Sequence, residues 1–445
     1  MGTVKELTRK MKDSGVEWIG EIPEDWEVVK LKNIARIMTG NTPSMSNEGY
    51  YSNSNGVPWI KPDNLLELDG VSDAKLKLTE SGKVQGRIVP KDTMLICAIG
   101  SIGKFGYTIE DSAFNQQINA ILFNSKVLKK YGLYYMSVQK EQQKYYGNGN
   151  VVQILNASNQ GMIYFTLPLI EEQKAIANFL DKKTQEIDNI ISKTKKAIEE
   201  YKKYKQSLIT ETVTKGLDKD VEMKDSGIEW IGEIPEHWDT IKFKDLFKFG
   251  SGLTITKSDL LDEGIKVINY GEIHSKYKFD LDINRDELKC VDKSYLENRK
   301  NALINKGDFV FCDTSEDREG SGNCIVLREN NDELIFAGSH TVTARLRRNE
   351  NPIYIRYMIM ASSIKEQISS TVVGIKVYSI TQAILKTIIG VIPPLKEQEQ
   401  IVSYLDKKTN QIDQIISTKE KLLIEMEAYK KSLIYETVTG KREVE

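Results

Sequence analysis

The sequence has few of the residues on which metal centres and disulfide frameworks depend. Its 445 residues include four cysteines, without a Cys-x-x-Cys pair, and three histidines, without clustered partners. A zinc site or a disulfide-stapled fold is therefore not expected. No apolar run approaches the roughly 18 residues that span a bilayer, and the N-terminal Met1–Glu6 has no apolar signal-peptide core. We expect a cytoplasmic protein with no metal, no bound cofactor of its own and no membrane partner.

A strong net charge is also missing. Lys and Arg total 62 against 64 Asp and Glu, a formal net charge of −2, so no global basic surface marks the chain as a nucleic-acid binder. Hydrophobic residues at 40% and charged residues at 28% are ordinary for a folded protein. The length is two to three times that of a typical domain, which predicts more than one core.

Catalytic signatures are absent as well. Gly100–Lys104 is similar to a phosphate loop, but a Walker A motif needs Gly at position 98 and Ser or Thr after the lysine, where Ala98 and Phe105 stand. We expect a Gly-rich turn there, exposed enough to touch a DNA phosphate. Asn351–Tyr354 differs from the Asn-Pro-Pro-Tyr loop of adenine methyltransferases at its third residue, so a helix start at Pro352 is the better interpretation. The chain by itself is expected to be non-catalytic.

What the sequence does contain is a long internal repeat. The box MKDSGVEWIGEIPEDW at Met11–Trp26 returns as MKDSGIEWIGEIPEHW at Met223–Trp238, with two differences in 16 positions. Leu180–Thr184, LDKKT, returns at Leu405–Thr409. The boxes repeat with an offset of 212 and the LDKKT segments with an offset of 225. Two near-identical sets of segments therefore enclose two inserts of different length and sequence, as expected of an internal repeat with two different recognition surfaces.

Each LDKKT segment lies in a predicted long helix. Residues 171–214 and 396–439 contain neither Pro nor Gly, and 44 residues would extend about 66 Å as one helix. Steps of four and three place apolar residues on a heptad-type seam. We expect the two helices to pack on each other, antiparallel by symmetry; two separate surface helices remain the alternative. The apolar seam positions are Leu180, Ile187, Ile191, Ile198 and Leu208, with Leu405, Ile412, Ile416, Leu423 and Leu433 opposite.

The sequences of the two inserts predict mixed α and β domains that are rich in strands. Short β-branched runs alternate with Gly, Asn and Asp turn signals, as in Val57–Ile60, Ile118–Phe123 and Val342–Leu346. A helix is expected near 128–144 and another near 353–369. The fold class is therefore α+β, with two strand-rich domains separated by two long antiparallel helices in a pseudo-two-fold repeat.

The two boxes, together with the two helix starts of the form E-Q-x-x-I-x-x-x-L-D-K-K-T, resemble the specificity subunit of type I restriction–modification systems, HsdS. The resemblance covers nearly the whole chain, since both motifs occur twice in the same order. It implies two target recognition domains, each of which reads one half of a gapped sequence in double-stranded DNA. It also implies helices that dock two methyltransferase subunits, and up to two restriction subunits that complete a nuclease. S-adenosylmethionine, ATP and Mg²⁺ would then belong to the partner subunits.

On this basis we expect six segments in chain order. They are 1–26, the N-terminal segment and first box; 27–166, recognition domain 1; 167–222, central helix and linker; 223–238, second box; 239–391, recognition domain 2; and 392–445, distal helix.

Base reading needs Arg or Lys for guanine and Asn or Gln for adenine, while backbone amides and Lys position phosphates. Polar loops of each insert supply such side chains, although a solvated turn is the alternative for any single one. The candidates in insert 1 are Gly40, Asn41, Thr42, Lys61, Asn64, Ser101, Lys104, Asn115, Gln116, Gln117, Asn148 and Asn150. Those in insert 2 are Gly252, Thr254, Ser315, Arg318, Ser339, His340, Thr341, Lys376 and Tyr378.

Three further expectations can be checked. Trp18, Trp26, Trp230 and Trp238 in the boxes should pack against the helices. Because the inserts differ, the DNA target should be asymmetric. The rival functions are a coiled-coil adaptor whose inserts bind proteins, and a self-contained methyltransferase, which no motif supports.

Overall fold

The computed structural model describes residues 9–149, 153–277, 279–315, 320, 322–371 and 378–444. The chain forms two compact units, Met1–Lys195 with Lys421–Glu445, and Lys196–Glu420. The unit boundaries therefore fall inside both long helices, because each half of one helix packs on a half of the other. No helix in the described ranges is long and apolar enough to cross a membrane.

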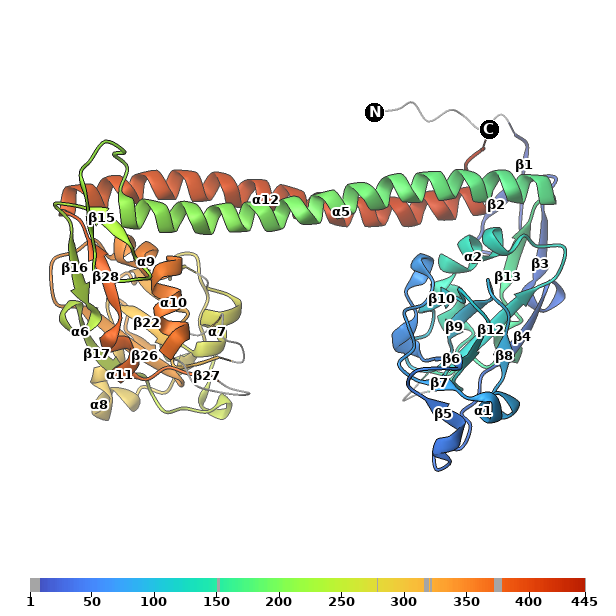
Figure 1. Cartoon of the computed structure of the whole chain (residues 1–445), viewed down its shortest axis with the longest axis horizontal. Coiled ribbons are helices and arrows are strands. Elements are labelled where there is room, and N and C mark those ends of the chain that lie inside the picture. Colours follow the sequence, from blue (N-terminus) through green and yellow to red (C-terminus); the bar gives the residue numbers. More distant parts are fainter. Residues whose placement is uncertain are drawn as a thin grey trace. The chain divides into compact units, whose positions relative to one another are not determined.

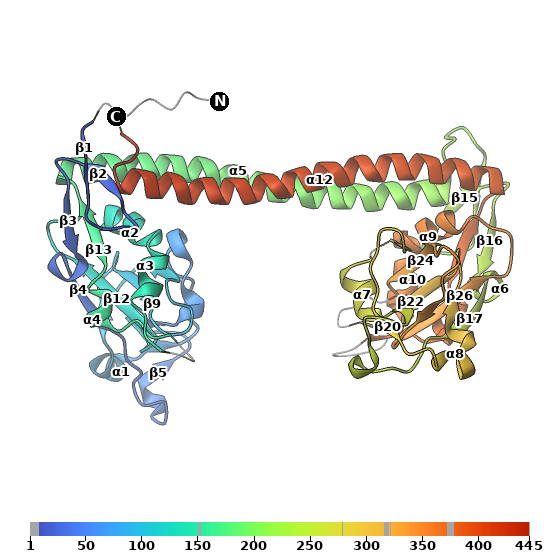
Figure 2. The ribbon, with the colours of Figure 1, turned by 180° about the vertical axis from the view of Figure 1, so that it is seen from behind.

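The long helices are α5, Ile170–Lys215, and α12, Leu395–Val438, within one residue of the expected 171–214 and 396–439. Figures 1 and 2 show them side by side and antiparallel. Within unit 1, Lys430 Nζ of α12 lies 2.7 Å from Asp188 Oδ2 of α5. Within unit 2, Lys205 Nζ of α5 lies 2.6 Å from Asp413 Oδ2 of α12. The two ion pairs fix an antiparallel register, which confirms the expected packing.

Insert 1 forms two sheets, and β13 (Tyr164–Leu167) closes it by pairing with β3 (Glu27–Lys30). The antiparallel sheet has the order β10-β9-β12-β4 and the other has the order β5-β7-β6-β11-β8. The bounds are β4 Ala35–Thr39, β5 Tyr51–Ser52, β6 Val57–Ile60, β7 Lys77–Leu78, β8 Ile88–Val89, β9 Met94–Cys97, β10 Phe105–Tyr107, β11 Ser112–Phe114 and β12 Ile118–Phe123. The helices are α1 Glu80–Gln85, α2 Lys129–Ser137, α3 Lys140–Tyr145 and α4 Ala157–Gln160.

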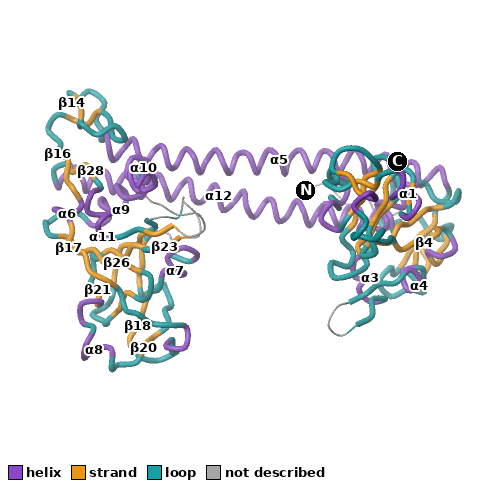
Figure 3. The backbone as a smooth tube through the Cα atoms, turned by 60° about the horizontal axis from the view of Figure 1, so that its bottom comes forward, coloured by secondary structure: helices purple, strands orange, loops and turns teal. Residues whose placement is uncertain are grey.

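Insert 2 repeats this plan with a longer first sheet, β17-β26-β22-β24-β19, and a shorter second one, β20-β18-β25-β21. Figure 3 shows its strands in one block, with α9 and α10 on the side of the long helices. The strands are β16 Asp239–Lys242, β17 Phe247–Ser251, β18 Ile265–Ile268, β19 Asp280–Asp282, β20 Cys290–Val291, β21 Leu303–Ile304, β22 Phe309–Cys312, β23 Thr314–Ser315, β24 Cys324–Glu329, β25 Ile335–Ala337, β26 Thr341–Leu346, β27 Tyr378–Ser379 and β28 Ile389–Ile392. The helices are α6 Phe243–Leu246, α7 Tyr270–Ser275, α8 Tyr295–Asn298, α9 Pro352–Met360, α10 Ser362–Thr371 and α11 Gln382–Thr387.

The repeated boxes form small hairpins, β1 (Met11–Asp13) with β2 (Glu21–Pro23), and β14 (Met223–Asp225) with β15 (Glu233–Pro235). The short 3₁₀ helices are η1 Leu31–Asn33, η2 Glu48–Tyr50, η3 Pro62–Asn64, η4 Glu67–Asp69, η5 Lys257–Asp259 and η6 Lys300–Ala302.

The expected insert helices near 128–144 and 353–369 are each broken in two. In insert 1 the Ser137 hydroxyl donates to the Tyr134 carbonyl and α2 ends at Val138. In insert 2 the backbone turns extended at Ala361, and the Ser362 amide donates to the Thr210 hydroxyl on α5. A local hydroxyl contact in insert 1 and a hydrogen bond to α5 in insert 2 therefore accompany breaks in helices that the sequence periodicity predicts to be continuous. The start of α9 is as expected, since the Asn351 side chain caps it and Pro352 is its first residue.

Candidate nucleic-acid interface

Backbone hydrogen bonds gather the polar loops of insert 1 at one place. The Gly40 amide donates to the Ile118 carbonyl at 2.9 Å, and the Asn41 amide donates to the Phe114 carbonyl at 3.1 Å. The Asn115 amide donates to the Ile60 carbonyl at 3.0 Å. The ends of β4, β6 and β11 therefore lie together.

The β9–β10 loop joins the same place. The Ala98 amide donates to the Gln117 carbonyl at 2.7 Å, and the Leu155 amide donates to the Ala98 carbonyl at 2.8 Å. Asn148 pairs with Ile154, which pairs with Ile99. We call residues 40–42, 61–64, 98–104, 115–117 and 148–149 the polar edge of unit 1. Every insert 1 candidate except Asn150, which lies outside the described residues, falls on it.

Several asparagines of this edge are occupied by local hydrogen bonds. Asn41 donates to the Gln85 carbonyl and accepts from the Arg87 amide. Asn64 accepts from the Lys61 amide and donates to the Ser72 hydroxyl. Asn115 is buried and its amide donates to Gln117 Oε1 at 3.0 Å. These three side chains hold the loops in position, and their contact with bases stays a prediction.

The side chains that face solvent at this edge are fewer. Ser101, Gln116 and Asn148 are exposed, and Lys61, Lys104 and Gln117 are half-buried. The Lys61 ammonium lies 4.9 Å from the centroid of the Trp59 ring, while the Thr42 hydroxyl donates to Gln116 Oε1. Gln117 is thus a long polar side chain on the turn that enters the central strand β12.

Insert 2 builds its corresponding edge with the same hydrogen bonds. The Gly252 amide donates to the Thr341 carbonyl at 3.1 Å, and the Gly338 amide donates to the Ile268 carbonyl at 2.8 Å. The Asp313 amide donates to the His340 carbonyl at 3.1 Å, as the Ala98 amide does to Gln117. We call residues 252–254, 269–270, 313–315, 338–341 and 378 the polar edge of unit 2. His340 is the structural counterpart of Gln117.

His340 is unusual in its backbone as well as its position. Its φ is +56°, in the left-handed region that non-glycine residues rarely adopt. Its ring is exposed, lies edge-on to Tyr270 at 5.2 Å between centroids, and has Nδ1 3.3 Å from Asp313 Oδ1. Strain of this kind is retained where the surrounding structure imposes it, often at functional positions.

The other insert 2 candidates differ in accessibility. Ser339 accepts from the Ile255 amide, and Thr341 is buried with its hydroxyl on the Gly338 carbonyl. Ser315 is buried and pairs with the half-buried Tyr378. Thr254 is exposed. The candidates Arg318 and Lys376 lie outside the described residues.

A basic recess beside the polar edge of unit 2 is absent from the sequence-based candidates. It has a volume of about 480 Å³. Its charged lining residues are Lys248, Arg299, Lys300, Asp308 and Arg345. Arg345 donates to both oxygens of the buried Asp308, and this hydrogen bonding raises the pKa of the guanidinium. No linear motif joins these residues, because the register of β17 with β26 and the turn at η6 bring them together.

The long helices carry the predicted seam. Buried on it are Leu180, Ile187, Ile198, Leu208, Leu405, Ile412 and Leu433, and half-buried are Ile191, Ile416 and Leu423. The helices also anchor the inserts in the same way in both units. The Tyr131 hydroxyl donates to the Val438 carbonyl in unit 1, and the Tyr354 hydroxyl donates to the Val213 carbonyl in unit 2.

The box tryptophans divide into two pairs. Trp26 and Trp238 are fully buried, and their indole N–H groups donate to Glu172 and Glu397 at the helix starts, each at 2.9 Å. Trp18 and Trp230 remain 37% and 43% exposed. The Trp18 carbonyl accepts a hydrogen bond from the Tyr435 hydroxyl of α12, and the Trp18 ring centroid lies 5.1 Å from that of Tyr145. Packing of the Trp230 ring against the helices stays a prediction.

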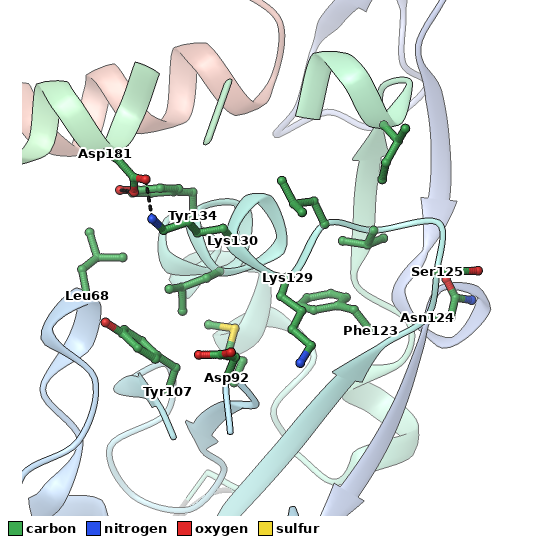
Figure 4. A pocket seen from close by; sticks show the side chains of 15 residues that line it. Leu68, Asp92, Tyr107, Phe123, Asn124, Ser125, Lys129, Lys130, Tyr134 and Asp181 are labelled. Atoms are coloured by element: carbon green, nitrogen blue, oxygen red, sulfur yellow. Dashed lines mark hydrogen bonds and ion pairs between the residues drawn. The ribbon is translucent and has the colours of Figure 1, made fainter. Parts of the chain in front are cut away.

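Figure 4 shows a larger cavity, of about 880 Å³, in unit 1. It lies between α2 and α5, away from the polar edge, and its lining includes Met94, Leu133 and Tyr134. Lys130 and Tyr134 both contact Asp181 of α5 at its border. In unit 2 the counterpart of Leu133 is Arg356, which stacks on Phe279, and Phe279 packs on Tyr357. Unit 2 therefore places a cation and two aromatic rings in contact where unit 1 has Leu133 in the cavity lining.

No group of three or more His, Cys, Asp or Glu side chains that could hold a metal occurs among the residues the structure describes. The four cysteines are buried free thiols. Burial raises the pKa of the Cys324 thiol to about 12.

Comparison with known proteins identifies similar sequences and folds. The family model described as "Type I restriction modification DNA specificity domain" matches residues 23–200 and 235–426. The MjaVIII specificity subunit of Methanocaldococcus jannaschii is 26% identical over 437 residues, which cover 94% of this chain and 93% of that protein. The EcoKI specificity subunit of Escherichia coli K12 is 19% identical over 409 residues, with 87% and 83% covered.

Two solved structures share the fold. A chain from a study of assembly and conformational transition of the type I R-M system superposes with a TM-score of 0.72 at 12% identity, covering 95% of this chain and 99% of that one. The HsdS subunit of Thermoanaerobacter tengcongensis superposes with a TM-score of 0.53 at 12% identity, with 95% and 98% covered.

Proposed function

This chain belongs to the family of type I restriction–modification DNA specificity proteins, and from that membership we propose that its two inserts read the two halves of a gapped, asymmetric DNA target. The observation that carries this proposal is the pair of polar edges. The same backbone hydrogen bonds build both edges, yet the side chains that they present differ.

The difference is clearest at the turn before the central strand. Unit 1 presents Gln117 there, and unit 2 presents His340. The Oε1 of Gln117 accepts from Asn115 Nδ2, so its amide N–H groups are the atoms that would donate to a base. An imidazole instead donates or accepts one hydrogen bond with each ring nitrogen. Unlike side chains on like scaffolds favour two different half-sites. The target is therefore asymmetric in this proposal.

We further propose that the long helices dock two methyltransferase subunits. Beside the seam, Ile190 and Tyr429 are 45% and 48% exposed in unit 1. Tyr204 and Ile415 occupy the equivalent positions in unit 2 and are also exposed. In each pair one residue belongs to α5 and the other to α12. The antiparallel register given by the Asp188–Lys430 and Lys205–Asp413 contacts brings the two residues to the same level of the helix pair. Exposed apolar pairs that flank a coiled-coil seam suit the packing of a further helix.

In this account the methylation chemistry takes place in the partners. They bind S-adenosylmethionine and methylate adenine N6, and restriction subunits that use ATP and Mg²⁺ add cleavage. The six segments expected from the sequence keep their roles, with recognition in 27–166 and 239–391 and docking in 167–222 and 392–445.

Modification-sensitive long-read sequencing of a host that expresses this chain with its methyltransferase subunit tests the proposal. The expected result is N6-methyladenine in one bipartite motif with a fixed gap and unlike halves. Deletion of either insert should abolish the motif. Methylation that persists unchanged without an insert would contradict DNA reading and favour the coiled-coil adaptor.

A further inference from the structure

The edge strand of each insert carries basic residues that the reading loops do not use. In insert 2 this strand is β17, whose Lys248 pairs directly with Arg345 of β26. Like charges opposite each other on neighbouring strands are destabilising unless something compensates them. Asp308 compensates Arg345, since the guanidinium donates to both oxygens of its carboxylate.

The remaining cations of this recess have no such partner. Lys248, Arg299 and Lys300 are exposed, and none forms an ion pair with any acidic residue in the described ranges. Three of the four cations in the recess of about 480 Å³ are therefore uncompensated, which leaves it with a formal charge of about +3 in a chain whose net charge is −2. A concave site of one charge sign attracts anions.

Two glycines of the recess lining pack closely against the neighbouring segment of insert 2. Gly250 and Gly252 contribute to its lining. A Cβ added at Gly252 would lie 2.1 Å from the Gly338 carbonyl oxygen, and one at Gly250 would lie 2.6 Å from Thr343 Oγ1. Because glycine has no Cβ, β17 can pack closely on β26. Backbone atoms of this segment then line the recess beside the polar edge.

Insert 1 places one basic residue on its own edge strand, β4. Arg36 occupies the position equivalent to Lys248, and it is exposed. The Arg87 guanidinium donates to the carbonyl of Thr39, the last residue of β4, from the segment that precedes β8. Arg299 and Lys300 of insert 2 occupy the corresponding segment before β21. Two inserts of unlike sequence thus both carry a cation on the edge strand and cations in the segment before the equivalent strand, β8 or β21.

We propose that the edge strands β4 and β17, together with the segments before β8 and β21, bind the phosphodiester backbone of DNA, while the polar edges read bases. Arg36 and Arg87 contact phosphates beside one half-site, and Lys248, Arg299 and Lys300 contact phosphates beside the other. This inference rests on the proposed function, since it assigns the sequence-independent contacts of the same DNA interface. A feature shared by both inserts suits the part of DNA that is the same at every site.

The test uses the complex of this chain with its methyltransferase subunits and measures affinity against salt concentration. The probes are a fluorescent duplex that carries the motif methylated in the host and a scrambled duplex of equal length. Each phosphate contact contributes about −0.9 to the slope of log affinity against log salt. Arg299→Ala/Lys300→Ala should therefore weaken both duplexes similarly and make the slope shallower by about two units.

Two variants control for charge and folding. Lys219→Ala/Lys224→Ala removes two other cations of unit 2, outside the recess, and should leave the slope unchanged. Arg299→Lys/Lys300→Arg keeps the charges and should retain the wild-type slope. The parallel Arg36→Ala/Arg87→Ala variant should reproduce the loss in insert 1.

The outcomes separate this inference from the proposed function. An unchanged slope in Arg299→Ala/Lys300→Ala would overturn the phosphate assignment, and so would a variant whose methylome accepts new bases in one half-site. A wild-type complex that binds the two duplexes equally would instead overturn the proposed function.

Discussion

Three asparagine side chains of the polar edge of unit 1 form hydrogen bonds that hold their own loops in position. Asn41, Asn64 and Asn115 are residue types that read adenine, yet each is committed to a backbone or side-chain neighbour. Sequence reasoning selected loops that the fold brings together at one edge, and their contact with DNA stays a prediction. It could not distinguish an asparagine that shapes a turn from one that faces solvent. That distinction depends on which strands become neighbours.

Tyr131 illustrates the energetic value of one hydroxyl. It is fully buried, burial raises its pKa, and its hydroxyl donates to the carbonyls of Thr166 and Val438. Tyr131→Phe should lower the free energy of unfolding by about 1–3 kcal/mol, because buried carbonyls lose a donor. Denaturant unfolding monitored by circular dichroism measures this loss.

Tyr145→Phe provides the matched control, since Tyr145 is 69% exposed. Its effect should stay within about 0.5 kcal/mol. Equal effects of the two substitutions would contradict the assigned role of the Tyr131 hydroxyl in joining α2 to α12.

The buried thiol of Cys324 should make the free energy of unfolding depend on pH. Burial raises its pKa from 9.0 to about 12 in the folded chain, so the unfolded chain ionises first as pH rises. Its contribution to stability is full below pH 9 and is lost as pH rises from about 9 toward 12. Cys324→Ala should therefore flatten the decline in unfolding free energy over that range, compared with the wild type. A decline of the same steepness in both proteins would refute this assignment.

At the scale of elements, the repeat and the heptads predicted the long helices within one residue, and β-branched runs predicted β6 and β12 with their observed bounds. Periodicity failed at the breaks after Ser137 and at Ala361, because hydroxyl contacts there come from tertiary neighbours or local caps. The basic recess was also missed, since Lys248, Arg299 and Arg345 are far apart in the sequence. The register of β17 with β26 and the turn at η6 bring them together.

Substitutions of two isoleucines on α5 can distinguish the stability of the helix pair from the docking of the methyltransferase subunit. Ile187 is 5% exposed on the seam, whereas Ile190 is 45% exposed beside it. Ile187→Ala should destabilise the chain by about 2–5 kcal/mol. Ile190→Ala should change stability by no more than about 0.5 kcal/mol and still weaken capture of the methyltransferase subunit. Unfolding curves and co-purification of the subunits measure the two effects.

Because Tyr204 and Ile415 would still hold one methyltransferase subunit on unit 2, the measured quantity is the number of subunits that co-purify per chain. Two subunits per chain in Ile190→Ala, alone and combined with Tyr429→Ala, would contradict docking on this side of the helices. The same combination leaves the seam residues in place. Loss of the partner could then not be attributed to unfolding of α5 and α12.

At the scale of the whole molecule, the chain repeats one structural plan with two sets of surface residues. Glu172 and Glu397 receive the indole donors of Trp26 and Trp238, and Tyr131 and Tyr354 anchor their inserts in the same manner. The boxes and the long helices are therefore equivalent in the two units. The inserts should determine which DNA sequence is read. The account predicts that the order of half-sites follows the order of inserts.

The most direct test replaces insert 2, residues 239–391, by a second copy of insert 1, residues 27–166, and maps methylation in the host. Two identical readers on a pseudo-symmetric frame should methylate a palindromic gapped motif built from the half-site of insert 1. An asymmetric motif that retains the wild-type half-site of insert 2 would contradict the central claim that each insert reads one half of the target.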